Sequence, residues 1–167
     1  MTTPTDFAIL APVPQVHLDD GVAVAAREGF VAFGSRKWEL FRKIDELRRT
    51  QPVPVLIYPS HEDILGKLAF RVCWIGEYVG HVESVAGAHP DGMCHRPPST
   101  ADHPSDNRGY WAVFWHVRKL APLPSGKDMS IGELQAHASG TWRKNAPPRG
   151  PDLVYVPPEL ASEVAAL

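Results

Sequence analysis

The chain has 167 residues, of which 44% are hydrophobic and 22% charged, and its formal net charge is -2. These proportions are ordinary for a globular protein with one sizeable core, and they predict a single domain over residues 1–167. So small a net charge does not imply global attraction to nucleic acid or anionic membranes, so any such contact must come from a local patch. The chain has no apolar run of about 18 residues, and its N-terminus lacks a secretion signal. We therefore expect a cytoplasmic protein with no membrane partner.

The chain opens with two strand-and-helix pairs. FAILAPV (7–13) is typical of a strand that proline ends, and residues 17–28 carry apolar residues on one helical face before a terminating glycine. FVAF (30–33) predicts a short second strand. Ser35 is suited to cap a second helix over 35–49. The predicted inward stripe of that helix is Leu40, Phe41, Ile44 and Leu47.

The rest of the chain predicts mostly strands. VPVLIYPS (53–60), residues 67–84 and GYWAVFWHVRKLAPLP (109–124) are β-rich, and we expect them in one curled sheet. The long irregular loop 86–109 separates the last two, and such a loop in a compact domain usually carries function or is disordered. SIGELQAHAS (130–139) and the C-terminal PELASEVAAL predict short helices. The expected fold class is α/β (α+β), a curled mixed sheet or small barrel flanked by short helices.

A cationic segment follows, TWRKNAPPRGPDLVY (141–155), in which prolines alternate with positive charges and no carboxylate occurs before Asp152. The prolines stiffen the backbone, so the cations are fixed before a polyanion arrives. Each contact with a phosphate releases counterions and adds salt-sensitive affinity. The candidate phosphate-binding residues are Arg143, Lys144 and Arg149. The alternative is a solubilising surface loop.

The order of elements and several strings resemble the YTH and EVE branch of the PUA-like superfamily. The strings are FAIL, GFVAFGS, VPVLIYPS, KLAFRVCWIGEYVG, GYWAVFWHVRKLAPLP and TWRKNAPPRGPDLV, and together they extend from Phe7 to about Pro158. The resemblance implies a small barrel-like sheet that holds a modified or unpaired base in an aromatic pocket. It also implies that neighbouring cations hold the phosphates, so the expected partner is DNA or RNA carrying a modified base.

On this resemblance Phe30, Phe33 and Trp142 supply apolar walls of the pocket, and main-chain groups near Ser35 read the base edge. Most of the five tryptophans are nevertheless expected in the core. Trp111, for example, shares a predicted strand face with other apolar residues. The tryptophan of the cationic segment is the least core-like of the five by context.

The chain also departs from the pattern that it resembles. The family's tryptophan falls near Val31, and the polar Ser-Asp-Asn that commonly follows the first strand is replaced by Pro12, Val13 and Pro14. Loss of one aromatic wall forfeits stacking of roughly 1–3 kcal/mol. We therefore expect weak or no preference for N6-methyladenine over adenine, and a better fit for a bulkier or more polar modification such as a substituted cytosine.

Catalytic and metal-binding interpretations have less support. His89, His95 and His103 lie in the long loop with Cys94 beside one of them, but this spacing matches no closed zinc pattern, so we expect no metal. No P-loop, nucleophile elbow or paired-glycine motif occurs, and we expect no cofactor.

Two other functions remain open. An amidohydrolase of the neighbouring ASCH type, acting on a modified nucleoside, would need a lysine or carboxylate poised as a base. Lys37, Lys67, Glu77 and Glu83 are available, but no spacing selects one of them. A protein-interaction domain that uses loop 86–109 is the third possibility. We predict a binding module with no catalytic residues, of undetermined oligomeric state.

Overall fold

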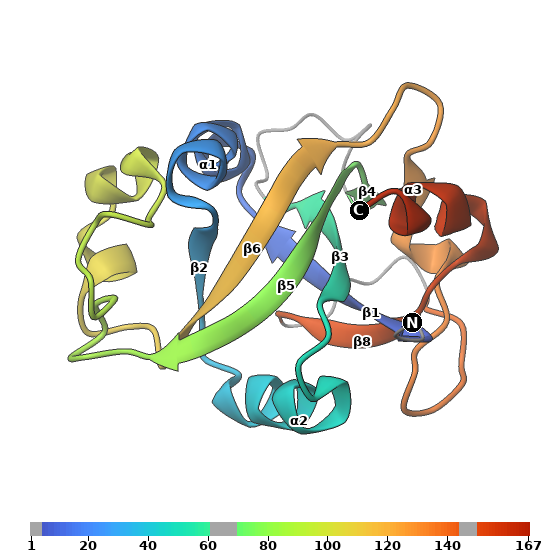
Figure 1. Ribbon diagram of the computed structural model, residues 1–167, viewed down its shortest axis with the longest axis horizontal. Helices are drawn as coiled ribbons and strands as arrows, with labels where there is room; N and C mark the ends of the chain where they lie inside the picture. Colours follow the sequence, from blue (N-terminus) through green and yellow to red (C-terminus); the bar gives the residue numbers. More distant parts are fainter. Residues whose placement is uncertain (1–4, 61–69, 144–149) are drawn as a thin grey trace.

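The computed structural model describes residues 5–60, 70–143 and 150–167 (Figure 1). The strands are β1 Phe7–Val13, β2 Val31–Ser35, β3 Val53–Pro59, β4 Arg71–Val72, β5 Trp74–Glu83, β6 Val113–Pro122, β7 Met129–Ser130 and β8 Asp152–Tyr155. The helices are α1 Gln15–Glu28, α2 Trp38–Arg48 and α3 Ala161–Ala165. The short 3-10 turns are η1 Pro98–Asp102, η2 Pro104–Asn107, η3 Ile131–Glu133 and η4 Pro158–Leu160.

Six strands form a mixed sheet in the order β2-β6-β5-β3-β1-β8, and β4 pairs with β7 in a separate two-stranded sheet. Strands β1 and β3 are parallel, and the other pairings are antiparallel. The pairing of β5 with β6 contains two register shifts, and such bulges increase the local twist. In Figure 1 these two long strands cross the front of the sheet, with α1 and α2 at opposite ends. The predicted curled α+β sheet is confirmed, and it is open rather than closed into a barrel.

Both faces of the central strands are buried, which explains their continuous apolar sequences. In β1, Ile9 packs with α1 and α2, whereas Leu10 points to the opposite face. The first face holds Leu18 of α1 and Ile44 of α2. The second face is covered by the C-terminal segments, including Leu160. The parallel pair β1 and β3 is therefore the centre of the core.

The two long helices were predicted correctly, but their details differ. Helix α1 ends at Glu28, and the next residue, Gly29, adopts φ 90° and donates its N–H to Ala25 O, as expected of a terminating glycine. The predicted cap at Ser35 is wrong, because this residue pairs with β6 and α2 begins only at Trp38. Leu47 is 48% exposed and does not belong to the inward stripe. Among the described residues, no helix is long and apolar enough to cross a membrane.

The later strands follow the prediction in part. Strands β3, β5 and β6 lie in one sheet as expected. The predicted strand over 67–84 begins outside the described residues, and its next part forms β4 in the separate sheet. The predicted helix over 130–139 is only the turn η3, which Ser130 and Glu133 cap reciprocally. Loop 86–109 is ordered, and its turn η1 contacts α1, where Ser99 N donates to Asp20 Oδ2 at 2.9 Å.

Replacement of Ile44 by alanine tests the packing of α2 on the sheet. Ile44 is fully buried, so Ile44→Ala should lower the free energy of unfolding by about 2–5 kcal/mol. Leu47→Ala, on the exposed side of the same helix, is the matched control and should cost less than about 1 kcal/mol. Urea unfolding of both variants measures the difference, and equal losses would contradict this orientation of α2.

Candidate functional site

A cavity of about 260 Å³ lies where the end of β1 approaches β2. These two strands are not hydrogen-bonded neighbours in the sheet. The open, curled sheet therefore leaves a gap between them, which residues of loop 86–109 help to enclose. The cavity is lined by Pro12, Val13, Pro14, His17, Phe33, Gly34, Ser60, Arg96, Asp106 and Trp111.

A second cavity of about 220 Å³ adjoins the first and shares three of its lining residues, Pro12, Gly34 and Trp111. Its other lining residues are Ser35, Arg36, Lys37, Tyr110, Gly150 and Pro151. This second space is cationic on one side and aromatic on the other. We call these two adjoining cavities together the depression; the first has mostly apolar walls, and Arg36 and Lys37 border the second.

The aromatic wall of the depression depends on Gly34. A Cβ atom at this position would lie 2.4 Å from the indole of Trp111, so only glycine lets the indole lie directly against β2. The neighbouring Tyr110 meets the indole edge-on, with ring centroids 4.6 Å apart. The prediction that Trp111 is a core residue is wrong, because β6 begins only at Val113 and the indole instead lines both cavities.

Backbone groups of β2 also face the depression. Ala32 N donates to His95 O, and Ala32 O accepts from Arg96 Nη1, both at 2.7 Å, so this residue turns its backbone away from β6. Backbone groups two residues apart on a strand point to the same side. Gly34 therefore presents its own N–H and C=O on the cavity side of β2.

Asp106 is the acidic group of the first cavity. Its Oδ1 accepts from Trp111 Nε1 at 3.2 Å, and its Oδ2 lies 3.5 Å from His17 Nε2. Burial opposes ionisation of this carboxyl, but the contacts with His17, Arg96 and Trp111 outweigh it and hold the pKa of Asp106 below its usual value. The side chain is thus a fixed anionic acceptor at neutral pH.

Arg96 fixes the loop that carries Asp106. Its guanidinium is buried and donates to Ala32 O, to Asn107 Oδ1 at 3.0 Å and to Asp106 O at 2.9 Å. It also lies over the ring of Phe114, 4.8 Å from the centroid. Burial lowers the pKa of Arg96 to about 10, against the opposing effect of Asp106. The group therefore stays charged at neutral pH and joins the loop to β2.

The predicted base-binding residues fall in different places. Phe33 lines the first cavity and Ser35 the second. Phe30 lies outside both cavities, stacked between His95 and His116 with centroids 4.2 and 4.1 Å apart. Trp142 is 65% exposed, bridges to Gln135 and lines neither cavity.

The predicted phosphate-binding residues are only partly described. Arg143 Nη2 donates to Asp152 Oδ2 at 3.0 Å, so its guanidinium is already paired. Lys144 and Arg149 lie outside the described residues. Gly150, the next residue in sequence, lines the second cavity. This end of the cationic segment therefore borders the depression.

The candidate bases for hydrolysis are also separated. Lys37 lines the second cavity, where its Nζ donates to Pro151 O at 2.9 Å. Glu77 is bound to Arg118 at 2.6 Å and lines neither cavity, and Glu83 ends β5. Lys67 lies outside the described residues. The titratable groups of the first cavity are instead His17, Arg96 and Asp106, which the sequence interpretation did not select.

Comparison with known proteins found no family model that matches the chain and no curated protein that matches it. The resemblance to YTH and EVE domains therefore remains a prediction from the strings that carry it. Support for a function therefore comes from the residues and geometry of the depression alone.

Asp106→Asn tests the anionic acceptor. We expect a loss of about 1–3 kcal/mol in the free energy of unfolding at pH 7, because His17 and Arg96 lose their charged partner. Since the folded pKa is depressed, the aspartate's advantage is present above its unfolded pKa of about 4. The advantage disappears as pH falls through the folded value. Urea unfolding at pH 7 and near pH 3 measures this change.

Asp102→Asn, an exposed carboxylate in the same loop, is the control for the loss of one negative charge. It should change stability by less than about 0.5 kcal/mol at either pH. If the two variants behaved alike, Asp106 would not hold the contacts described above.

Proposed function

We propose that the protein binds one modified or unpaired base of DNA or RNA in the depression between β1 and β2, as a binding module without catalysis. The observation that carries this proposal is the combination of an aromatic cavity, a fixed anionic acceptor and outward-facing backbone groups beside a cationic opening. The aromatic cavity would take the faces of the base, and the anionic acceptor and backbone groups would bind its edge. The cationic opening would hold the phosphate.

The size of the cavity favours a single base. A volume of about 260 Å³ lies below the roughly 300–1,000 Å³ that is typical of drug-sized ligands. Trp111 and Phe33 supply aromatic surface, and Pro12 and Pro14 supply apolar surface. Stacking of a base on one aromatic face is worth roughly 1–3 kcal/mol and is tolerant of base type.

The polar groups favour a base that carries an amine. Carboxylates accept from the exocyclic amine of cytosine in nucleic-acid recognition, and each oxygen of Asp106 retains acceptor capacity beyond its present contact. Gly34 adds a backbone donor and acceptor for the rest of the edge. The carboxylate of Asp106 and the backbone groups of Gly34 together favour a substituted cytosine. N6-methyladenine is less suited, because its methyl group requires a cage of several aromatic walls.

The second cavity supports phosphate binding. Arg36 is exposed and lies over Tyr110, 5.2 Å from the ring centroid, while Lys37 lies beside it on the same opening. Cations placed next to a base pocket can hold the flanking phosphates of a single strand. The other two predicted phosphate-binding cations, Lys144 and Arg149, lie outside the described residues, so this proposal rests on Arg36 and Lys37.

Hydrolysis receives less support from the same groups. A general base works best with a pKa near the working pH. Asp106 is held below its usual pKa and is committed to His17 and Trp111, so it is a weak base at pH 7. The cavity suits recognition of an edge better than proton transfer.

Two tryptophan variants distinguish this site from the cationic segment. Trp111→Ala should weaken binding of a single-stranded oligonucleotide with a substituted cytosine by about tenfold to a hundredfold, because the stacking face is lost. Trp142→Ala, which removes an exposed tryptophan that lines neither cavity, should change affinity by less than about threefold. Fluorescence anisotropy titrations of matched oligonucleotides that differ in one base measure both effects.

If Trp142→Ala weakened binding more than Trp111→Ala did, the base site would lie in the cationic segment instead. Absence of binding to any plain or modified oligonucleotide would refute the proposed function. Strong selection of N6-methyladenine over cytosine derivatives would refute the assignment of the base edge to Asp106.

The salt dependence of the same titration tests the phosphate contacts. The logarithm of the affinity should fall against the logarithm of salt concentration with a slope of about 2–4. Arg36→Ala should reduce this slope by about 1 while base preference stays unchanged. Lys127→Ala, an exposed cation distant in sequence and beside Glu163, is the control and should leave the slope unchanged. A slope that Arg36→Ala does not alter would contradict its role.

A further inference from the structure

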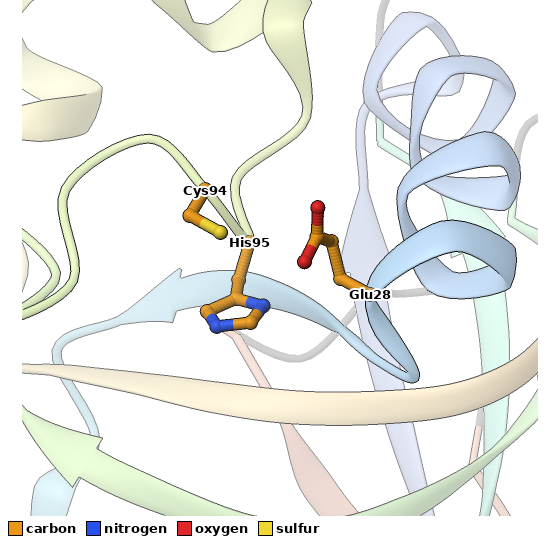
Figure 2. Close-up of side chains that lie close together, drawn as sticks. All are labelled: Glu28, Cys94 and His95. Atoms are coloured by element: carbon orange, nitrogen blue, oxygen red, sulfur yellow. The ribbon is translucent and has the colours of Figure 1, made fainter.

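Three side chains with metal-ligating atoms meet on the far side of loop 86–109. The ligand atoms of Glu28, Cys94 and His95 all lie within 4.8 Å of one another. Figure 2 shows the carboxylate, the thiol and the imidazole converging between the end of α1 and the loop. None of the three residues lines the base cavity. From this geometry we propose that the protein binds one divalent transition-metal ion of the zinc class through Glu28, Cys94 and His95.

The imidazole is already oriented for a ligand. The ring of His95 stacks on Phe30, and the backbone carbonyl oxygen of His95 accepts from Ala32 N, so both the ring plane and the backbone are held. His95 Nδ1 is buried and has no hydrogen-bond partner within the part of the chain that the structure describes. The other ring nitrogen, Nε2, lies 3.7 Å from Asp91 Oδ2. A carboxylate behind the second nitrogen is the usual support of a metal-bound histidine.

The carboxylate and thiol provide the remaining donors. Glu28 is the last residue of α1, and the negative end of a helix dipole favours a cation there. Arg27 Nε now donates to Glu28 Oε1 at 3.0 Å, but the Arg27 side chain is 60% exposed, and ion pairs with so exposed a partner contribute little. Cys94 is exposed, and a metal ion would bind its thiol as the thiolate, with release of the proton.

The donor set determines the class of metal. Thiolate, imidazole and carboxylate together suit zinc and related ions, whereas magnesium and calcium prefer oxygen ligands alone. Bonds of about 2.0–2.3 Å to a tetrahedral ion place ligand atoms about 3–4 Å apart. The present separations therefore need movements of roughly 1 Å, which the exposed side chain of Cys94 and the half-buried side chain of Glu28 can make while His95 stays in place. Three protein ligands leave a fourth position for water.

A metal at this point would join two segments, helix α1 and loop 86–109. Glu28 belongs to α1, Phe30 leads into β2, and the Cys94–His95 pair belongs to the loop that carries Asp106 and Arg96. The ion would thus hold the loop to the end of α1, just before the strand that forms the cavity wall, without contacting the base. The site does not rest on the proposed base binding, and its test needs no nucleic acid.

The experiment is a titration of the metal-free, full-length protein with Co²⁺, followed by competition with Zn²⁺. We expect one equivalent of Co²⁺ to bind with a thiolate-to-cobalt charge-transfer band in the near ultraviolet. Zn²⁺ should displace it and raise the melting temperature. Cys94→Ser should abolish the band, and His95→Gln and Glu28→Gln should each weaken affinity by about tenfold or more.

Cys73→Ser is the matched control, because it removes the other free cysteine, which is not part of the cluster. It should leave both band and affinity unchanged. Absence of a band in the wild type, or a band that survives Cys94→Ser, would overturn the proposal. Equal affinity in wild type, Glu28→Gln and His95→Gln would also overturn it, since the metal would then be held elsewhere.

Discussion

The cavity depends on the hydrogen bonds and charge contacts of one buried group, the guanidinium of Arg96. A buried ion without partners costs several kcal/mol, so such a group persists only where hydrogen bonds and opposite charge surround it. Arg96 meets this condition with three acceptors, the ring of Phe114 and the charge of Asp106. Two of these acceptors are in its own loop and one is in β2, at Ala32. The loop and the strand are therefore stabilised together, and the cavity between them persists only while both are in place.

A second set of contacts holds the same loop at its earlier residues. Phe30 stacks between His95 and His116, and His89 Nε2 lies 3.1 Å from His116 Nε2. Burial, together with the neighbouring His89, lowers the pKa of His116 to about 4. The ring is therefore neutral at neutral pH and packs as an aromatic group. These contacts hold the loop at His89 and His95, whereas Arg96 holds it beside the cavity, so the loop has two separate supports.

The main elements could be predicted from sequence because local signals decide them. Apolar runs such as FAILAPV indicate strands, and glycine at position 29 indicates where α1 ends. Errors arose where tertiary pairing overrides local preference. Ser35 is a good helix cap by residue type, but its backbone is used by β6. Trp111 follows the alternation of the next strand in sequence, but the strand starts two residues later.

The candidate site was less predictable, because its residues come from distant parts of the chain. Phe33 and Ser35 were selected from a resemblance, and they do line the depression. Nothing in the sequence singles out Asp106 or Arg96 as site residues, except that they lie in the unusually long loop 86–109. Glu28 is an ordinary helix residue in sequence, and only the fold brings it to Cys94 and His95. Spacing rules in the sequence could not find a cluster whose third side chain comes from another element.

The close packing of Trp111 against Gly34 has an evolutionary consequence. The indole occupies the space of a missing Cβ atom, so the two positions constrain each other across separate segments of the chain. A descendant that gains a side chain at position 34 must lose or relocate the indole, and with it the aromatic wall. A descendant that keeps glycine but replaces the tryptophan gains an unfilled space beside the backbone. Joint retention of this glycine and tryptophan would therefore trace the ancestry of the pocket through chains whose other residues have diverged.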